Sequence, residues 1–155
     1  MLAYLSPDRR QEANDATPER LIVLFYDQVI DSLHTGISAI ARNDIQERCN
    51  ALTTAAELLG DMLQCFELDS DDVIIGNLRQ LHSFVIVNLP KVNLYNDAKL
   101  LAECIRLLKP IRDAWAVTDQ VAKHPLQGGK LPHPAVIPPV AKGGRPRLTL
   151  VAPAS

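Results

Sequence analysis

Four histidines are the side chains in this sequence best suited to metal, acid–base or phosphate chemistry. They are His34, His82, His124 and His133. A di-iron site in a helical bundle needs Glu-x-x-His on two helices, and no histidine here has a glutamate three residues before it. Asp31-x-x-His34 is a single imperfect match. The sequence therefore indicates neither a metal site nor a cofactor.

One chemical alternative stays open for two of these histidines. Phosphotransfer bundles accept a phosphoryl group on an exposed histidine in the middle of a helix, and His34 and His82 both fall in the middle of predicted helices. A histidine without a chemical role is the commoner case. Loss of transfer from a response-regulator partner in His34→Gln or His82→Gln would distinguish the two.

Residues for nucleophilic catalysis are not arranged in any known pattern. Neither Gly-x-Ser-x-Gly nor a phosphate-binding glycine loop occurs. Cys49, Cys65 and Cys104 lie in predicted helices and lack CxxC spacing. Such an odd set is typical of reduced thiols in a cytosolic protein. The sequence therefore predicts that the protein is not an enzyme.

Charge and proline content divide the chain near residue 120. The 155 residues carry a net charge of −2, but residues 17–120 hold 15 acidic and 9 basic side chains. Residues 121–155 hold five basic side chains, no acidic one and seven of the 11 prolines. This composition predicts a disordered basic tail over 121–155.

The basic tail raises the question of nucleic acid. Gly143-Gly144-Arg145-Pro146-Arg147 resembles part of a minor-groove hook but lacks a second arginine before the glycines. The net charge of the whole chain excludes a domain-wide nucleic-acid footprint. A solubilising tail is the commoner explanation, and binding to an acidic partner, or back onto the acidic part of this chain, explains it equally simply.

The stretch Ala16–Ala41 is the clearest predicted helix. Thr17 is a suitable N-cap, and Pro18 suits the first helical position. Its apolar residues recur every three or four positions, which places one stripe on one face. They are Ile22, Tyr26, Val29, Leu33, Ile37 and Ile40. Asn43 can end this helix in the left-handed conformation, and Asp44 can cap the next.

Three further helices are predicted by the same periodicity. The second carries apolar residues from Ile45 to Phe66, the third carries them from Ile74 to Val92, and the fourth from Leu100 to Trp115. Asp69 or Ser70 is the expected cap of the third helix, and Asn96 that of the fourth.

Two prolines interrupt this pattern. Pro90 in the last turn of the third helix can bend or stop it, and Pro110 is expected to kink the fourth. The connections between the helices are short, so sequential helices must be antiparallel.

The predicted fold is thus an all-α, up-down-up-down four-helix bundle over residues 16–120. No stretch reaches the length of an apolar membrane span, and no signal peptide is recognisable at the start. We therefore expect a cytoplasmic protein.

The third helix has more apolar residues than one stripe requires. Phe84-Val85-Ile86-Val87 surrounds the helix, which indicates either deep burial or contact with a partner. Residues 1–15 have no regular pattern: Met1–Leu5 is apolar, and Ser6–Arg10 is polar and turn-like. This segment is either a frayed terminus or a small apolar plug that folds back on the bundle.

The order and spacing of these residues resemble the FliS family of flagellin-specific export chaperones. The resemblance covers about residues 1–118. It is carried by Met1–Leu5, Ala16–Asp27, Asn43-Asp44-Ile45, Asn77-Leu78 with Leu81, Asn93 with Asn96-Asp97, Leu107-Leu108 and Ile111–Trp115. Gln28 stands where the family usually has glycine, and His82 and Phe84 stand where it has tyrosines. The tail after Lys123 has no counterpart.

The resemblance implies a cytosolic bundle without enzymatic activity. Chaperones of this family bind the disordered C-terminal segment of new flagellin, which folds into helices along apolar grooves. Binding prevents early polymerisation and presents flagellin to the type III export gate. The N-terminal segment with the tyrosine matching Tyr4 can cover part of the apolar surface.

We accordingly predict a client-binding groove of eight residues and a two-residue plug. The groove residues are Leu52, Ala55, Leu59 and Met62 on the second helix and Leu78, Phe84, Ile86 and Val87 on the third; the plug residues are Tyr4 and Leu5. Core packing is the alternative role for each. The runner-up function is an adaptor for another protein client or, through the tail, for nucleic acid. The oligomeric state stays open.

Overall fold

The computed structural model describes residues 1–65 and 72–123, and these residues form helices joined by short connections. The elements are η1 (Leu2–Tyr4), α1 (Pro7–Asn14), α2 (Pro18–Arg42), α3 (Ile45–Gln64), α4 (Val73–Tyr95) and α5 (Ala98–Lys123). The predicted all-α class is confirmed. The predicted tail lies, from residue 124 on, outside the described residues, and so does Phe66.

Helix α2 begins and ends as its sequence predicts. The Thr17 hydroxyl accepts a hydrogen bond from the backbone N–H of Arg20 at 3.2 Å, and Pro18 follows it. Asn43 ends the helix with φ of 57°. Asp44 then caps α3 by accepting from the N–H of Glu47 at 2.9 Å. Local capping chemistry thus determines this connection.

The predicted caps of α4 and α5 are wrong by one to three residues. Asp72, rather than Asp69 or Ser70, caps α4 by accepting from the N–H of Ile74 at 2.8 Å. Asn96 is the left-handed C-cap of α4, with φ of 53°. The N–H of Leu100 therefore bonds to the carboxylate of Asp97, at 3.0 Å, instead of to Asn96.

Neither proline ends its helix. α4 continues past Pro90 to Tyr95, and α5 runs without interruption through Pro110. A proline deprives a helix of one backbone hydrogen bond and crowds one carbonyl. In this chain the packing of the surrounding turns outweighs that loss.

A short helix occupies the N-terminal segment that the sequence predicts to be turn-like. α1 covers Pro7–Asn14 and contains a single apolar residue, Ala13. It therefore has no apolar stripe to reveal it. Ala13 packs against the core, and the other contacts that hold the helix are polar and reach residues far along the chain.

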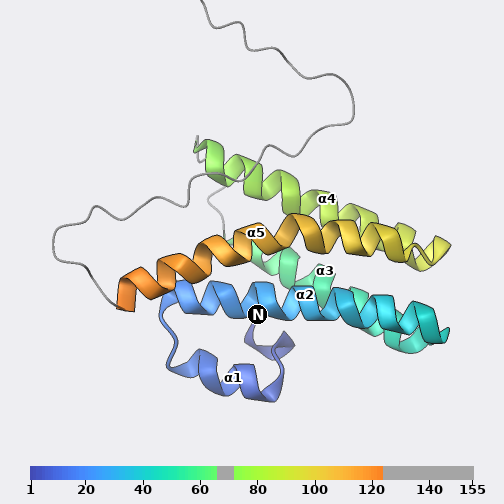
Figure 1. Cartoon of the computed structure of the whole chain (residues 1–155), viewed down its shortest axis with the longest axis horizontal. Coiled ribbons are helices and arrows are strands. Elements are labelled where there is room, and N and C mark those ends of the chain that lie inside the picture. The colour runs from blue at the N-terminus through green and yellow to red at the C-terminus, as the bar shows by residue number, and fades with distance from the viewer. Residues whose placement is uncertain (66–71, 124–155) are drawn as a thin grey trace, which may run out of the picture.

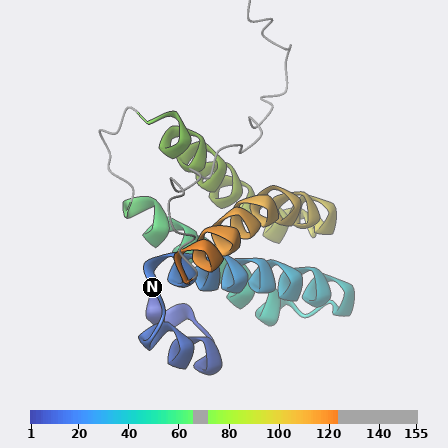
Figure 2. The ribbon, with the colours of Figure 1, turned by 60° about the vertical axis from the view of Figure 1, so that its left-hand side comes forward.

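The four long helices run antiparallel, with α2 beside both α3 and α5 and with α4 completing the bundle (Figure 1). α4 and α5 lie close where Asn96 and Asp97 join them and diverge toward the start of α4 (Figures 1 and 2). α1 lies outside the bundle against α2.

The core runs along the bundle axis. It contains side chains from each long helix, including Val29, Leu33, Leu58, Leu59, Leu81, Val85, Leu101 and Leu108, each at most 1% exposed.

Polar contacts fasten the end of the bundle where α4 joins α5. The buried guanidinium of Arg48 on α3 donates to the side-chain oxygens of Asn93 and Asn96, and to the Asn93 carbonyl at 3.3 Å. Arg48 thereby ties the start of α3 to the end of α4. The opposite end, where α4 diverges, holds the site described next.

Candidate functional site

An apolar pocket of about 690 Å³ lies between the starts of α2 and α4 and the ends of α3 and α5. Its lining includes one charged residue, Asp72 at the cap of α4. The lining residues are Met1, Leu2, Leu21, Ile22, Phe25, Tyr26, Met62, Cys65, Asp72, Ile74, Ile75, Leu78 and Trp115. A hollow of this size and character suits apolar side chains of a ligand.

One buried polar contact supports the pocket from within the core. The hydroxyl of Tyr26 and Nε2 of His82 are hydrogen-bonded at 2.8 Å, which joins α2 to α4. His82 is 0% exposed, and burial lowers its pKa from 6.5 to about 4. Burial also raises the pKa of Tyr26. Both groups are therefore neutral at pH 7, and a histidine so enclosed does not suit phosphotransfer.

The N-terminal segment lies at the mouth of the pocket. Met1 and Leu2 are part of its lining, and the amino group of Met1 is 3.2 Å from the carboxylate of Asp61. The next residues turn toward the other side of α2. Tyr4 and Leu5 line a second, shallower hollow of about 310 Å³ between α2 and α3.

Tyr4 and Leu5, the predicted plug residues, differ in burial. Leu5 is 2% exposed and belongs to the core, whereas Tyr4 is partly buried against it. Nearby Glu57 raises the pKa of the Tyr4 hydroxyl, helped by desolvation and by Asp61. Two carboxylates of α3 therefore stand close to Tyr4.

Polar contacts with α2 hold the N-terminal segment in place. Gln28 Oε1 accepts from the backbone N–H of Ser6 and from Arg9 Nη1, each at 3.1 Å. Arg9 Nη2 also donates to Asp31 at 2.5 Å. We call Ser6, Arg9, Gln28 and Asp31 the bracket. Through it, Gln28 ties α1 and the residue before it to α2.

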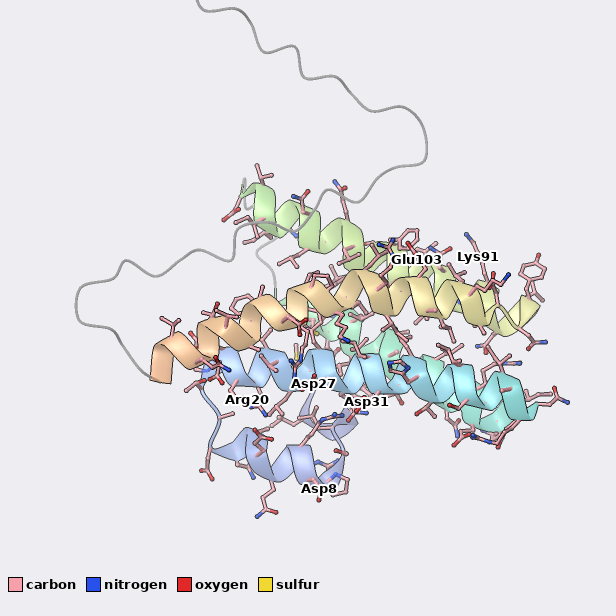
Figure 3. All side chains as sticks on the ribbon, in the orientation of Figure 1. Asp8, Arg20, Asp27, Asp31, Lys91 and Glu103 are labelled. Atoms are coloured by element: carbon pink, nitrogen blue, oxygen red, sulfur yellow. The ribbon has the colours of Figure 1, made fainter. Side chains whose placement is uncertain are left out.

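Asp27 and Asp31 of α2 form hydrogen bonds with two different helices. Asp27 and Asp31 lie one turn apart on α2 (Figure 3). Asp31 belongs to the bracket, whereas Asp27 accepts from Arg112 of α5 at 2.7 and 3.3 Å. These hydrogen bonds to Asp27 raise the pKa of the Arg112 guanidinium. The walls that α2 and α5 contribute to the pocket are thereby held together.

The eight predicted groove residues fall into three groups in the structure. Met62 and Leu78 line the pocket. Leu52, Ala55 and Leu59 are core residues, each at most 2% exposed, and a client could reach them only if the helices separated.

The remaining three predicted residues lie further along α4. Phe84 is 36% exposed and Val87 is 64% exposed, whereas Ile86 is partly buried against the core. The structure therefore does not bring the eight residues together on one surface.

Sequence reasoning missed most of the pocket lining. Leu21, Ile22, Ile75 and Trp115 are partly buried, and each has the helical spacing of a core position. The order of the helices in the predicted bundle could have indicated this lining. In an antiparallel bundle the starts of the first and third long helices meet the ends of the second and fourth, so apolar residues at these four places must converge.

The described residues contain neither a metal-binding cluster nor a membrane-spanning helix. No group of three His, Cys, Asp or Glu side chains within 1–65 and 72–123 is placed to hold a metal ion. Among the same residues, no helix combines the length and hydropathy needed to cross a membrane.

Comparison with known proteins assigns the chain to a family. The family model for the flagellar protein FliS matches residues 1–122, which includes every described helix almost to its end. The chain belongs to the FliS family. The pocket, the long helices and the N-terminal segment all lie within the matched region, whereas the tail lies outside it.

Individual relatives agree with the family model. The flagellar secretion chaperone FliSB of Pseudomonas aeruginosa is 27% identical over 115 residues, covering 74% of this chain and 91% of that protein. The flagellar secretion chaperone FliS of Vibrio cholerae is 23% identical over 73% of this chain and 83% of its own. The Salmonella typhimurium FliS is 26% identical over 73% and 84%.

Proposed function

We propose that this FliS-family protein is a cytosolic chaperone that binds the C-terminal segment of flagellin, prevents premature polymerisation and presents flagellin to the type III export gate. The observation that carries this proposal is the apolar pocket at the end where α4 diverges. It lies within the family-matched region and contains no catalytic arrangement.

The chemistry of the pocket fits an amphipathic helix as ligand. Such a helix places apolar side chains in a groove at intervals of three or four residues. A flagellin segment that orders on binding loses conformational entropy, so the contact must bury a large apolar area. Phe84 and Val87 add exposed apolar surface further along α4, outside the pocket.

The N-terminal segment is suited to exchange with this client. Met1 and Leu2 lie in the pocket, and Leu2 is still 43% exposed. A client helix would displace these side chains and take over their contacts. The predicted plug would thus begin at Met1 and Leu2, with Tyr4 and Leu5 anchoring the segment beside it.

Substitutions in the first turn of α4 test the site with a matched control. Ile75 lines the pocket, whereas Val73 is 74% exposed and does not. We expect Ile75→Ser to weaken binding of a flagellin C-terminal peptide about tenfold or more, since burial of such a side chain contributes about 1.5–3 kcal/mol. Val73→Ser should bind within about twofold of the parent, a change well under 1 kcal/mol.

Titration calorimetry measures both affinities, and circular dichroism checks that both variants stay folded. Equal affinities for the two variants would contradict the pocket as the site. Full-length flagellin should be retained in a pull-down and flagellin lacking its C-terminal region should not. Equal retention of both would contradict the proposed client segment.

A further inference from the structure

We propose that the tail of this chain occupies the space of about 690 Å³ that Met1 and Leu2 leave open in the same pocket when no client is bound, through the apolar run Leu148-Thr149-Leu150-Val151 and the arginines before it. The proposal rests on the proposed function only in treating the pocket as a binding site. It assigns a role to residues 124–155, which lie outside the described residues and beyond the family match.

The place where the tail leaves the bundle supports this occupant. Trp115 of α5 lines the pocket, and α5 ends at Lys123. Eight helical residues span about 12 Å, so the tail starts close to the pocket. The Thr17 hydroxyl donates to Asp119 at 2.9 Å, which holds this last part of α5 against the start of α2.

The length of the connection allows the run to reach the pocket. Residues 124–147 separate α5 from Leu148, which is 24 residues. A chain of 24 residues spans up to about 80 Å when fully extended, several times the roughly 12 Å from Trp115 to Lys123, so its length permits a return to the pocket. Tethering of this kind gives an effective concentration in the millimolar range, so even a weak contact is occupied.

Charge complementarity favours the same occupant. Residues 124–155 contain Lys130, Lys142, Arg145 and Arg147 and no acidic residue. Asp72 lines the pocket, and the carboxylate of Asp61 lies 3.2 Å from the amino group of Met1, another lining residue. Arginines next to an apolar run can therefore face these carboxylates while the run enters the pocket.

The absence of proline distinguishes this run from the rest of the tail. Leu131–Val140 is also rich in apolar residues but contains Pro132, Pro134, Pro138 and Pro139. Proline prevents helix continuation, so that stretch cannot present apolar side chains at helical spacing. Residues 147–152 contain no proline. The proline-containing stretch Leu131–Val140 therefore provides a matched control.

The chain's single tryptophan supplies the readout, because Trp115 lines the pocket. The test uses the full chain with Leu148→Ser, Leu150→Ser and Val151→Ser combined. We expect acrylamide to quench Trp115 fluorescence at least about twofold more efficiently than in the parent. The control combines Val136→Ser, Ile137→Ser and Val140→Ser, and its quenching should equal that of the parent.

Three further observations sharpen this test. A peptide of residues 142–155 added to the Leu148/Leu150/Val151 variant should restore the protection. The parent's protection should fall at 0.5 M NaCl and should not change with protein concentration. Equal quenching of parent and variant, or equal effects of variant and control, would overturn the proposal. Protection that rises with protein concentration would overturn its intramolecular form.

Client binding separates this proposal from the proposed function. We expect the Leu148/Leu150/Val151 variant to bind the flagellin C-terminal peptide about threefold to tenfold more tightly than the parent, because it has no internal competitor. If the peptide binds neither protein while Trp115 protection changes as expected, the flagellin proposal fails and the tail proposal stands. If the peptide binds the variant and the parent equally and Trp115 is equally protected in both, the tail proposal fails and the flagellin proposal stands.

Discussion

His82 is a titratable residue inside the apolar core. Its imidazole is fully enclosed and hydrogen-bonded to the hydroxyl of Tyr26. A buried imidazole is tolerated while it is neutral and becomes costly when it is protonated. Acid should therefore lower the free energy of unfolding through this pair.

The pH dependence follows from the lowered pKa. His82 titrates at about 4 when folded and near 6.5 when unfolded, so protons bind the unfolded chain preferentially between these values. Its contribution to stability is complete above about pH 6.5 and decreases as the pH falls toward 4. The total loss amounts to about 3 kcal/mol.

Urea unfolding between pH 7.5 and pH 4 tests this expectation. The double variant Tyr26→Phe, His82→Leu removes both polar groups together and should lose about 3 kcal/mol less than the parent over that range. An equally steep decrease in both proteins would show that other groups dominate acid unfolding.

Residues that act locally were predictable, and residues that act across the chain were not. Thr17, Asn43 and Asp44 were predicted correctly because a cap bonds within its own turn. Asn96 was misassigned because Asn96 and Asp97 both suit a helix end, and only the left-handed backbone at Asn96 separates their roles.

At the scale of elements, α1 is a helix held mainly by side chains of another helix, α2. It has no buried residue, and its bracket depends on Gln28 and Asp31. No periodicity could have predicted it, since its partners lie about 20 residues further along the chain. Its stability should therefore depend on single polar side chains of α2.

Gln28→Ala tests that dependence. The substitution removes the acceptor for Ser6 and Arg9 while keeping a good helix former in α2. We expect faster amide hydrogen exchange in residues 6–14 by about fivefold, because a net hydrogen bond contributes about 1 kcal/mol. Binding of the flagellin peptide should tighten, since Met1 and Leu2 are released more easily.

Gln46→Ala is the matched control, because Gln46 bonds only within α3, to Asn50. It should leave both exchange and affinity unchanged. Unaltered exchange in Gln28→Ala would mean that the Arg9–Asp31 and Glu12–Arg20 ion pairs suffice to hold α1.

Two glycines report how closely the long helices pack. A Cβ at Gly36 of α2 would lie 3.1 Å from side-chain carbons of both Leu52 and Leu101, whereas a Cβ at Gly60 of α3 would meet nothing within 4 Å. Gly60→Ala should stabilise the fold by about 0.5–1 kcal/mol through helix propensity.

Gly36→Val should instead destabilise the fold by about 1–3 kcal/mol, because the added methyls overpack the contact between α2, α3 and α5. Urea denaturation of both variants measures the two effects. Stabilisation by Gly36→Val would show that this contact is looser than described.

At the scale of the whole molecule, the bundle and its direction were predictable and the pocket was not. Helix periods and short connections determine an antiparallel arrangement. The pocket depends on the divergence of α4 from α5, which no stretch of sequence encodes by itself (Figure 2). Met62 and Leu78 were found because they are apolar and well placed; Trp115 was not, because its spacing is that of the core.

The site that the sequence predicted also shows why exposure is hard to read from a pattern. Leu52, Ala55 and Leu59 share a heptad-like spacing with Met62, yet only Met62 lies where the helices part. The same spacing serves core and pocket alike, and position along the bundle axis decides between them.

Met1, α5's last turns and the pocket all lie at one end of the bundle. An affinity tag fused ahead of Met1 would replace the amino group that meets Asp61 and would start at the pocket's mouth. A reporter fused directly after Lys123 would crowd the same opening from the other side. Binding constants measured with such fusions would underestimate the affinity for the proposed client, and a label attached near Arg48, at the opposite end, would avoid this.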